Sequence, residues 1–222
     1  MTPTLRIELE VRPFERAPAE LVTAGFFADE RPLRGAAGRA DWRLCGLVSD
    51  LLASGHLRGR PGEALLVPSF GTLQAPRVLL MGLGERAGFD VSRVYAATRA
   101  LVARAFQLGV RELALAPPGV EPDDFPRHAG SVLEAALEAA REEGSELVLR
   151  LLVRESEAAR ALQALEAAQS AELADEVSLV LAPLASIRGS APESERERAA
   201  APTGGAARAR PLTGTPPPPR ST

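Results

Sequence analysis

The chain alternates between short apolar runs and longer stretches that place apolar residues every three or four positions. Residues 5–11 alternate apolar and charged side chains, the period-two pattern of a half-exposed β-strand. Residues 21–28 are almost continuously apolar, which predicts a strand buried on both faces. Further apolar runs predict strands at residues 64–67, 77–81, 110–116, 146–153 and 176–182.

The stretches between these runs have the apolar spacing of amphipathic helices, at residues 42–54, 90–108, 124–143 and 156–169. Asp41 is expected to cap the first of them, and Gly55 to follow its end in the left-handed conformation. Gly109 and Gly144 are expected to end the next two. Residues 31–40 contain glycine and proline breaks and are expected to form a loop.

Because strands and helices alternate, the chain is predicted to be an α/β protein. The expected architecture is a three-layer α/β/α sandwich with a mixed, mostly parallel sheet covered by helices on both faces. The first two strands have no helix between them, so they are candidates for an antiparallel pair at one side of the sheet.

Residues 1–185 are predicted to form this domain, and residues 186–222 a disordered tail. The tail is rich in Pro, Ala and Arg, ends in a run of four prolines, and holds only Ile187 and Leu212 as large apolar residues. Such a composition buries too little apolar surface to offset the entropy of ordering.

Composition narrows the function classes. The formal net charge of −3 gives no reason to expect nucleic acid as a partner. All 26 basic residues are arginine, because the sequence contains no lysine. The sequence also contains no asparagine. There is no basic and apolar leader in the first dozen residues and no apolar run near the ~20 residues that span a bilayer. The protein is therefore expected to be cytoplasmic, without a membrane anchor.

Candidate metal and nucleophile residues are few. His56, His128 and Cys45 lack the spacing of a metal site, and nothing beside Cys45 promises a reactive thiolate. Cys45 is expected to be a small buried residue beside the apolar stripe of the first helix. No catalytic residue, metal ligand or cofactor is predicted.

One glycine-rich loop stands where a phosphate-binding loop would be. Gly82 and Gly84 follow a strand and precede a helix, and with Ala87 they fit a loose G-x-G-x-x-A pattern. The helix, however, is predicted to begin only near residue 90, too late to point its N-terminal amides at these glycines. A turn that needs small residues is therefore the preferred interpretation.

The order of elements between residues 41 and 108 resembles the N-terminal domain of the leucyl (cytosol) aminopeptidases. The resemblance is carried by a helix ending in LLASG, the corner LRGRPGE, the strand LLVP, and the strand RVLLMGLG, followed by a long helix. It implies a macro-domain-like fold and a role in hexamer assembly, with DNA binding in some bacterial members.

The resemblance also bears on catalysis. The resemblance implies that the family's chemistry lies in a second domain, where a lysine, aspartates and a glutamate hold two metals. An arginine in an Asn-Thr-Asp-Ala-Glu-Gly-Arg motif and a second lysine assist there. The 222 residues contain no such motif. The chain is therefore expected to be non-catalytic and to act through a protein partner or as a homo-oligomer.

Two alternatives remain open. Macro domains bind ADP-ribose, so the chain is alternatively a binder of ADP-ribose or another nucleotide, with Asp29, Gly82 and Gly84 as candidate crevice residues. The other alternative is an accessory subunit of a full-length metallo-aminopeptidase.

Overall fold

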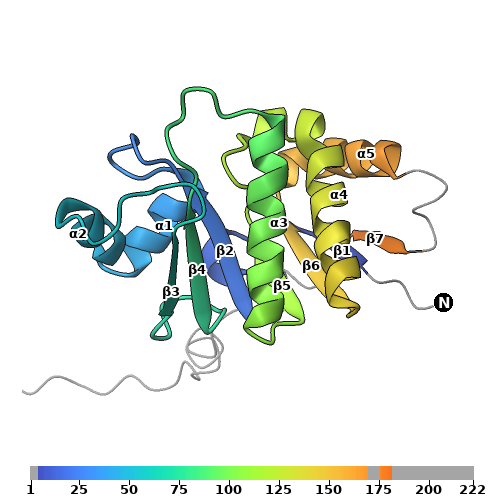
Figure 1. Ribbon diagram of the computed structural model, residues 1–222. Coiled ribbons are helices and arrows are strands. Elements are labelled where there is room, and N and C mark those ends of the chain that lie inside the picture. The colour runs from blue at the N-terminus through green and yellow to red at the C-terminus, as the bar shows by residue number, and fades with distance from the viewer. Residues whose placement is uncertain (1–4, 170–175, 182–222) are drawn as a thin grey trace, which may run out of the picture. The chain divides into compact units, whose positions relative to one another are not determined.

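A computed structural model describes residues 5–169 and 176–181 (Figure 1). Contacts divide the chain into Met1–Pro183 and Leu184–Thr222, and the predicted tail lies outside the described residues. The strands are β1 (Leu5–Glu10), β2 (Leu21–Phe26), β3 (Ala64–Pro68), β4 (Arg77–Gly82), β5 (Glu112–Leu115), β6 (Leu147–Leu152) and β7 (Val177–Leu181). The helices are α1 (Gly35–Arg43), α2 (Leu47–Ala53), α3 (Val91–Gln107), α4 (Phe125–Glu143) and α5 (Ala158–Ala168), with 3-10 turns η1 (Phe14–Arg16), η2 (Pro122–Asp124) and η3 (Glu155–Glu157).

The described strands form one mixed sheet in the order β3-β4-β2-β5-β6-β1-β7. All pairs are parallel except β3 with β4, so the prediction of a mostly parallel α/β sheet is confirmed. The suggested antiparallel pairing of the first two strands is wrong. β1 lies between β6 and β7, whereas β2 lies between β4 and β5, so the two strands do not pair with each other.

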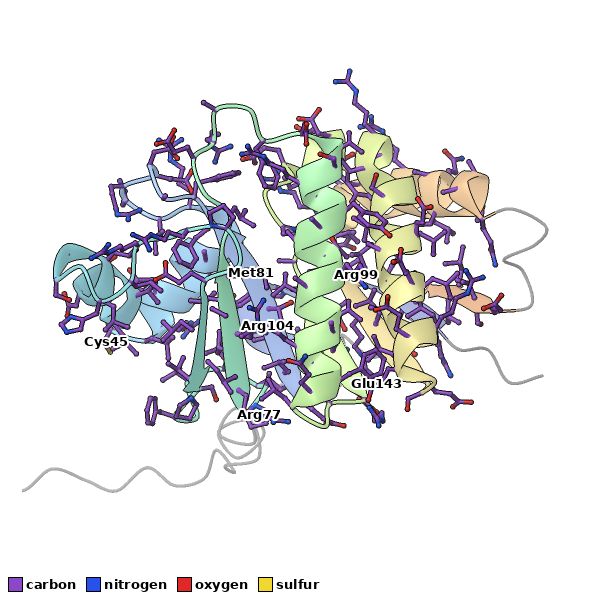
Figure 2. All side chains as sticks on the ribbon, in the orientation of Figure 1. Cys45, Arg77, Met81, Arg99, Arg104 and Glu143 are labelled. Atoms are coloured by element: carbon purple, nitrogen blue, oxygen red, sulfur yellow. The ribbon has the colours of Figure 1, made fainter. Side chains whose placement is uncertain are left out.

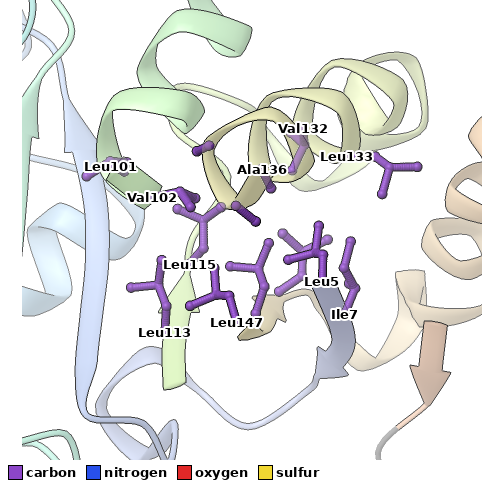
Figure 3. Close-up of a cluster of buried hydrophobic side chains, with 14 of the residues drawn as sticks. Leu5, Ile7, Leu101, Val102, Leu113, Leu115, Val132, Leu133, Ala136 and Leu147 are labelled. Atoms are coloured by element: carbon purple, nitrogen blue, oxygen red, sulfur yellow. The ribbon is translucent and has the colours of Figure 1, made fainter. Parts of the chain in front are cut away.

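Helices cover the sheet from two sides, and residue parity within each strand decides which side a residue packs on. In β4, Leu79 and Met81 join the core under α3, α4 and α5, whereas Val78 and Leu80 face α1 and α2. Figure 3 shows the first core, where Leu101 and Val102 of α3 meet strand residues such as Leu113. The three-layer prediction is thus confirmed.

The segment predicted as a loop and a single helix differs from the prediction. Helix α1 begins at Gly35 and ends at Arg43, and α2 starts only at Leu47. Between them, Cys45 and Gly46 have φ of 57° and 84°. Two successive left-handed residues reverse the chain, so one continuous helix cannot form. Cys45 is therefore exposed at this turn rather than buried (Figure 2).

The predicted start of α3 and the predicted end of α4 are confirmed. Asp90 caps α3 by accepting a hydrogen bond from the Arg93 N–H at 3.0 Å. Gly144 ends α4 in the left-handed conformation at φ 64°. The segment before β3, residues 57–63, is called the glycine corner. Helix α3 is linked to it, because Arg104 (labelled in Figure 2) donates a 2.8 Å hydrogen bond to the carbonyl of Gly62.

Candidate functional site

The glycine corner brings three chain segments into backbone contact. A Cβ added at Gly82 would lie 2.4 Å from the carbonyl oxygen of Arg60, and one at Gly84 would lie 2.9 Å from Pro61 Cγ. A Cβ at Gly59 would lie 2.9 Å from the Cα of Ala28. These glycines are therefore required for close packing of the loops after β2 and β4 against the corner before β3.

The amides of the candidate phosphate loop are already paired within the protein. The N–H groups of Gly82, Leu83 and Gly84 donate to the carbonyls of Glu63, Phe26 and Gly59 at 2.8, 2.9 and 2.9 Å. A phosphate-cradling loop needs such donors to point at the ligand. Close backbone packing, rather than phosphate binding, therefore explains why glycine occupies positions 82 and 84.

Asp29 lies beside this corner and has a structural partner. Its Oδ1 accepts a 3.0 Å hydrogen bond from the Arg86 N–H, which links the loop after β2 to the loop after β4. The structure therefore brings Asp29 close to the segment that contains Gly84, as the candidate set requires. None of the three candidate residues is among those that line the cavity described next.

A crevice of about 480 Å³ opens at the carboxyl ends of β1, β2, β5 and β6. In open α/β sheets this edge is where ligands bind. Its apolar floor includes Phe14, Ala24, Phe27, Ala116 and Leu152. Its charged rim consists of Arg12, Arg34, Arg39, Arg86, Arg154, Glu30, Glu121, Glu155 and Glu157.

A second feature is the hairpin that joins β3 to β4. Thr72 N–H donates a 3.0 Å hydrogen bond to the carbonyl of Ser69, which closes a four-residue turn. The central residues Phe70 and Gly71 have φ of 53° and 77°, both left-handed. The Phe70 side chain is nevertheless 75% exposed. A large aromatic residue is thus held in an unfavourable backbone conformation and presented to solvent.

The described residues offer no metal site. No three His, Cys, Asp or Glu side chains gather in residues 5–169 and 176–181. Over the same residues, no helix has the length and apolar character needed to cross a membrane. His56 hydrogen-bonds to Ser54 Oγ at 2.8 Å, and His128 lies in α4.

Residues 24–143 match the model of the N-terminal domain of the cytosol aminopeptidase family. The chain belongs to this family. The match includes the glycine corner and the β3–β4 hairpin, together with helices α1 to α4. The predicted family resemblance is confirmed.

Curated relatives match this aminopeptidase N-terminal domain over a small part of their length. A probable cytosol aminopeptidase of Burkholderia multivorans is 34% identical over 98 residues, which cover 42% of this chain and 19% of the relative. One from Methylobacillus flagellatus is 32% identical over 124 residues, or 55% of this chain and 25% of the relative. The chain thus spans about a fifth to a quarter of the length of these relatives.

Solved structures support the macro-like fold of the domain. A mutant tomato leucine aminopeptidase aligns with a TM-score of 0.57 at 16% identity, covering 75% of this chain and 35% of that one. An Oceanobacillus iheyensis macrodomain mutant aligns with a TM-score of 0.57 at 11% identity, covering 72% of this chain and 90% of that one. At these identities the likeness concerns the fold alone.

Sequence reasoning assigned a possible crevice to Asp29, Gly82 and Gly84, and it found neither the residues that line the observed crevice nor the exposed turn of the hairpin. The crevice collects side chains from β1, β2, β5 and β6 and from three helix starts, which no local spacing brings together. The left-handed Phe70 gave no local signal, because the link between Pro68 and Arg77 is eight residues long and a phenylalanine is not among the residues that favour positive φ.

Proposed function

We propose that this aminopeptidase N-terminal domain is non-catalytic and acts through association with a second protein chain. The observation that carries the proposal is Phe70, a bulky side chain that is 75% exposed on a left-handed backbone. For an ordinary L-residue this conformation costs about 1–2 kcal/mol. Strain of this kind collects at functional positions, and exposed aromatic residues anchor interfaces.

The edge of the sheet supports the same surface. β3 has β4 as its only strand neighbour within the described sheet, so its other side presents unpaired backbone groups. Leu66 on this strand is 43% exposed, and Phe70 follows two residues after the strand ends. Edge strands with exposed apolar side chains are templates for pairing with another chain. A second copy of the domain, paired along β3, is the partner that this geometry favours.

The kinds of side chain in this chain support the non-catalytic part of the proposal. A two-metal hydrolase needs converging carboxylates that clamp the metals and activate water. No such group of side chains occurs in the described residues, and the 222 residues contain no lysine. Purified protein is expected to release no N-terminal leucine from a peptide, with or without added zinc or manganese. Metal-dependent release that a chelator abolishes and that survives repurification would contradict this.

The association function is tested by replacing Phe70 with asparagine. Wild-type protein is expected to show a mass above 23.4 kDa by light scattering, rising with protein concentration toward the mass of a dimer. Asparagine tolerates the left-handed conformation well, so Phe70→Asn relieves strain and should raise the melting temperature when both proteins are compared at a concentration where the wild type is also monomeric. The same variant removes the aromatic anchor and should return the mass to that of the monomer.

The two readouts moving in opposite directions distinguish an interface residue from a structural one. A matched control is Trp42→Gln, since Trp42 is 74% exposed on α1 and lies outside the hairpin. This control should leave the mass unchanged. A wild-type protein that stays monomeric, and that also fails to bind an immobilised full-length cytosol aminopeptidase, would refute the proposal.

A further inference from the structure

We propose that two copies of this domain pair their β3 strands antiparallel, with Leu66 of one copy directly opposite Leu66 of the other. The inference rests on the association function proposed above and deepens it, because it fixes the direction and the register of the pairing. In Figure 1, β3 is the outermost strand beside β4. Three features of β3 support the register: the direction of its backbone groups, the proline at its end, and its exposed side chains.

The backbone of β3 bonds to β4 through every second residue. The N–H group of Ser69 donates to the carbonyl of Pro76 at 2.8 Å, and the N–H group of Gly82 donates to the carbonyl of Glu63 at 2.8 Å. Both contacts lie on the antiparallel register of β3 and β4. Hydrogen-bonded positions alternate along such a pair, so the odd-numbered residues of β3 face β4. The N–H and C=O groups of the even-numbered residues therefore point to the free edge of the sheet.

The groups on the free edge complement those of a second copy. They are the N–H and C=O groups of Ala64 and Leu66 and the C=O group of Pro68, because proline has no N–H group. When Leu66 lies opposite itself, the two leucines exchange a pair of hydrogen bonds across a two-fold axis. Each Ala64 N–H group then donates to the carbonyl of Pro68 in the other copy. Pro68 cannot return that bond, so in this register only the carbonyl of Ala64 keeps no partner on the edge.

The exposed side chains of β3 select this register. Leu66 lies opposite Leu79 of β4, so both side chains point to the α3 side of the sheet. Leu79 is 2% exposed and Leu66 is 43% exposed, so α3 covers β4 on this face but not β3. Leu66 is the largest of the exposed side chains of β3, and this register brings the leucines of the two copies into direct contact. A register with Leu66 opposite Ala64 also forms four hydrogen bonds, but it separates the leucines.

The register also gives Phe70 a place in the interface. Phe70 follows β3 by two residues, and continuing the pairing brings it level with Gly62 of the other copy. Its exposed ring then contacts the glycine corner of that copy. One two-fold pairing thus joins the strand edge, the exposed leucine and the exposed aromatic residue in a single surface.

Single cysteines along β3 of the full chain measure the register. Cys45 is exposed, so it is first replaced by serine. Residues directly opposite in a hydrogen-bonded pair have Cα atoms about 5.5 Å apart, which a disulfide spans, whereas it does not span more than about 7 Å. Under mild oxidation, Leu66→Cys should form disulfide-linked dimers at least about tenfold faster than Leu65→Cys or Val67→Cys. Ala64→Cys is the matched control, because residue 64 is exposed on the same face but lies opposite residue 68 in this register.

A charge at the two-fold axis tests the same contact without cross-linking. Like charges directly opposite each other destabilise a strand pair, so Leu66→Lys should raise the dimer dissociation constant at least about tenfold by light scattering. Val91→Lys is the matched control, because Val91 is 46% exposed and lies at the start of α3, outside β3. This control should leave the dissociation constant unchanged. Melting curves confirm that each variant is folded.

The outcomes separate this inference from the association function. A dimer that cross-links fastest at residue 64, 65 or 67 would leave the association function standing and overturn the register. Equal effects of Leu66→Lys and Val91→Lys would place the interface away from the two-fold axis at Leu66, and would also overturn it. A wild-type protein that stays monomeric would overturn the pairing, and the association function falls with it only if the protein also fails to bind a full-length cytosol aminopeptidase.

Discussion

Individual glycines in this domain serve two distinct physical purposes. Gly62 has φ of 76° but nothing within 4 Å of an added Cβ, so only its backbone conformation requires glycine. Gly82 is the reverse case, because an added Cβ would meet the backbone of Arg60 and Gly59 at 2.4 and 2.5 Å. Backbone atoms cannot move aside as the end of a side chain can. The two positions therefore separate conformational strain from steric exclusion.

Alanine at each position makes this separation measurable. Gly62→Ala should cost about 1–2 kcal/mol in the free energy of unfolding, the cost of a left-handed alanine. Gly82→Ala should cost more, because the end of β4 must move away from residues 59–60 before the methyl group fits. Denaturant unfolding of both variants checks the order. Equal losses would mean that the backbone contact at Gly82 relaxes freely.

At the scale of elements, the sequence predicted the long, regular pieces and missed the irregular ones. Helices α3 and α4 carry their own caps, Asp90 and Gly144, and their patterns are long enough to identify the helix. The α1–α2 break was not predictable in this way. Apolar spacing continues through it, and cysteine has no local preference for the left-handed conformation that Cys45 adopts.

The crevice illustrates a further limit of sequence reasoning. Its rim residues Arg34, Arg86 and Arg154 come from three loops that are far apart in the chain. Their proximity follows from the strand order, in which β6 separates β1 from β5. Alternation of strands and helices predicts a parallel sheet, but it does not give that order.

The α1–α2 turn has one side chain that stabilises it. Asp41 lies in α1, yet its Oδ1 accepts hydrogen bonds from the N–H groups of Val48 and Ser49 at 2.9 and 3.1 Å. The residue predicted to cap a helix thus caps α2 from the preceding helix. Asp41→Ala should cost about 1 kcal/mol of unfolding free energy.

Asp50→Ala is the matched control for this cap. Asp50 is an exposed carboxylate in the first turn of α2, and no hydrogen bond from its side chain is found in the described residues. Its loss should cost only a few tenths of a kcal/mol through the helix dipole. If the two variants unfold at the same denaturant concentration, the Asp41 hydrogen bonds contribute nothing to stability.

For the whole molecule, acidic residues with lowered pKa lie in a 3-10 turn, a helix cap and loops rather than in the apolar cores. Glu15 lies in η1, and desolvation raises its pKa less than backbone hydrogen bonding and the charges of Arg39 and Arg43 lower it. The pKa of Asp90 is lowered chiefly by the hydroxyl of Ser92. The apolar cores are insensitive to protonation, so acid should act first on the connections.

Glu63, in the glycine corner, gives the sharpest test of this idea. Desolvation raises its pKa, but the N–H groups of Arg58 and Arg60, at 2.9 and 3.1 Å, outweigh it, so the pKa lies below the usual 4.5. A lowered pKa in the folded state means that the unfolded chain binds more protons in this pH range. The stabilisation is therefore complete above the usual pKa and is lost as the pH falls through the lowered one.

Because the folded state lowers the pKa of Glu63, wild type and Glu63→Gln should differ in stability at neutral pH but not in acid. The glutamine amide cannot carry the charge that the two N–H groups favour, so the variant should melt at a lower temperature at neutral pH. As the pH falls below the lowered pKa, wild-type Glu63 becomes protonated as well, and the two melting temperatures should converge. A series of melting curves from neutral to acid pH measures the difference. If the gap between the two proteins stays constant across that series, the carboxylate charge of Glu63 does not stabilise the corner, and the contact is only one of shape.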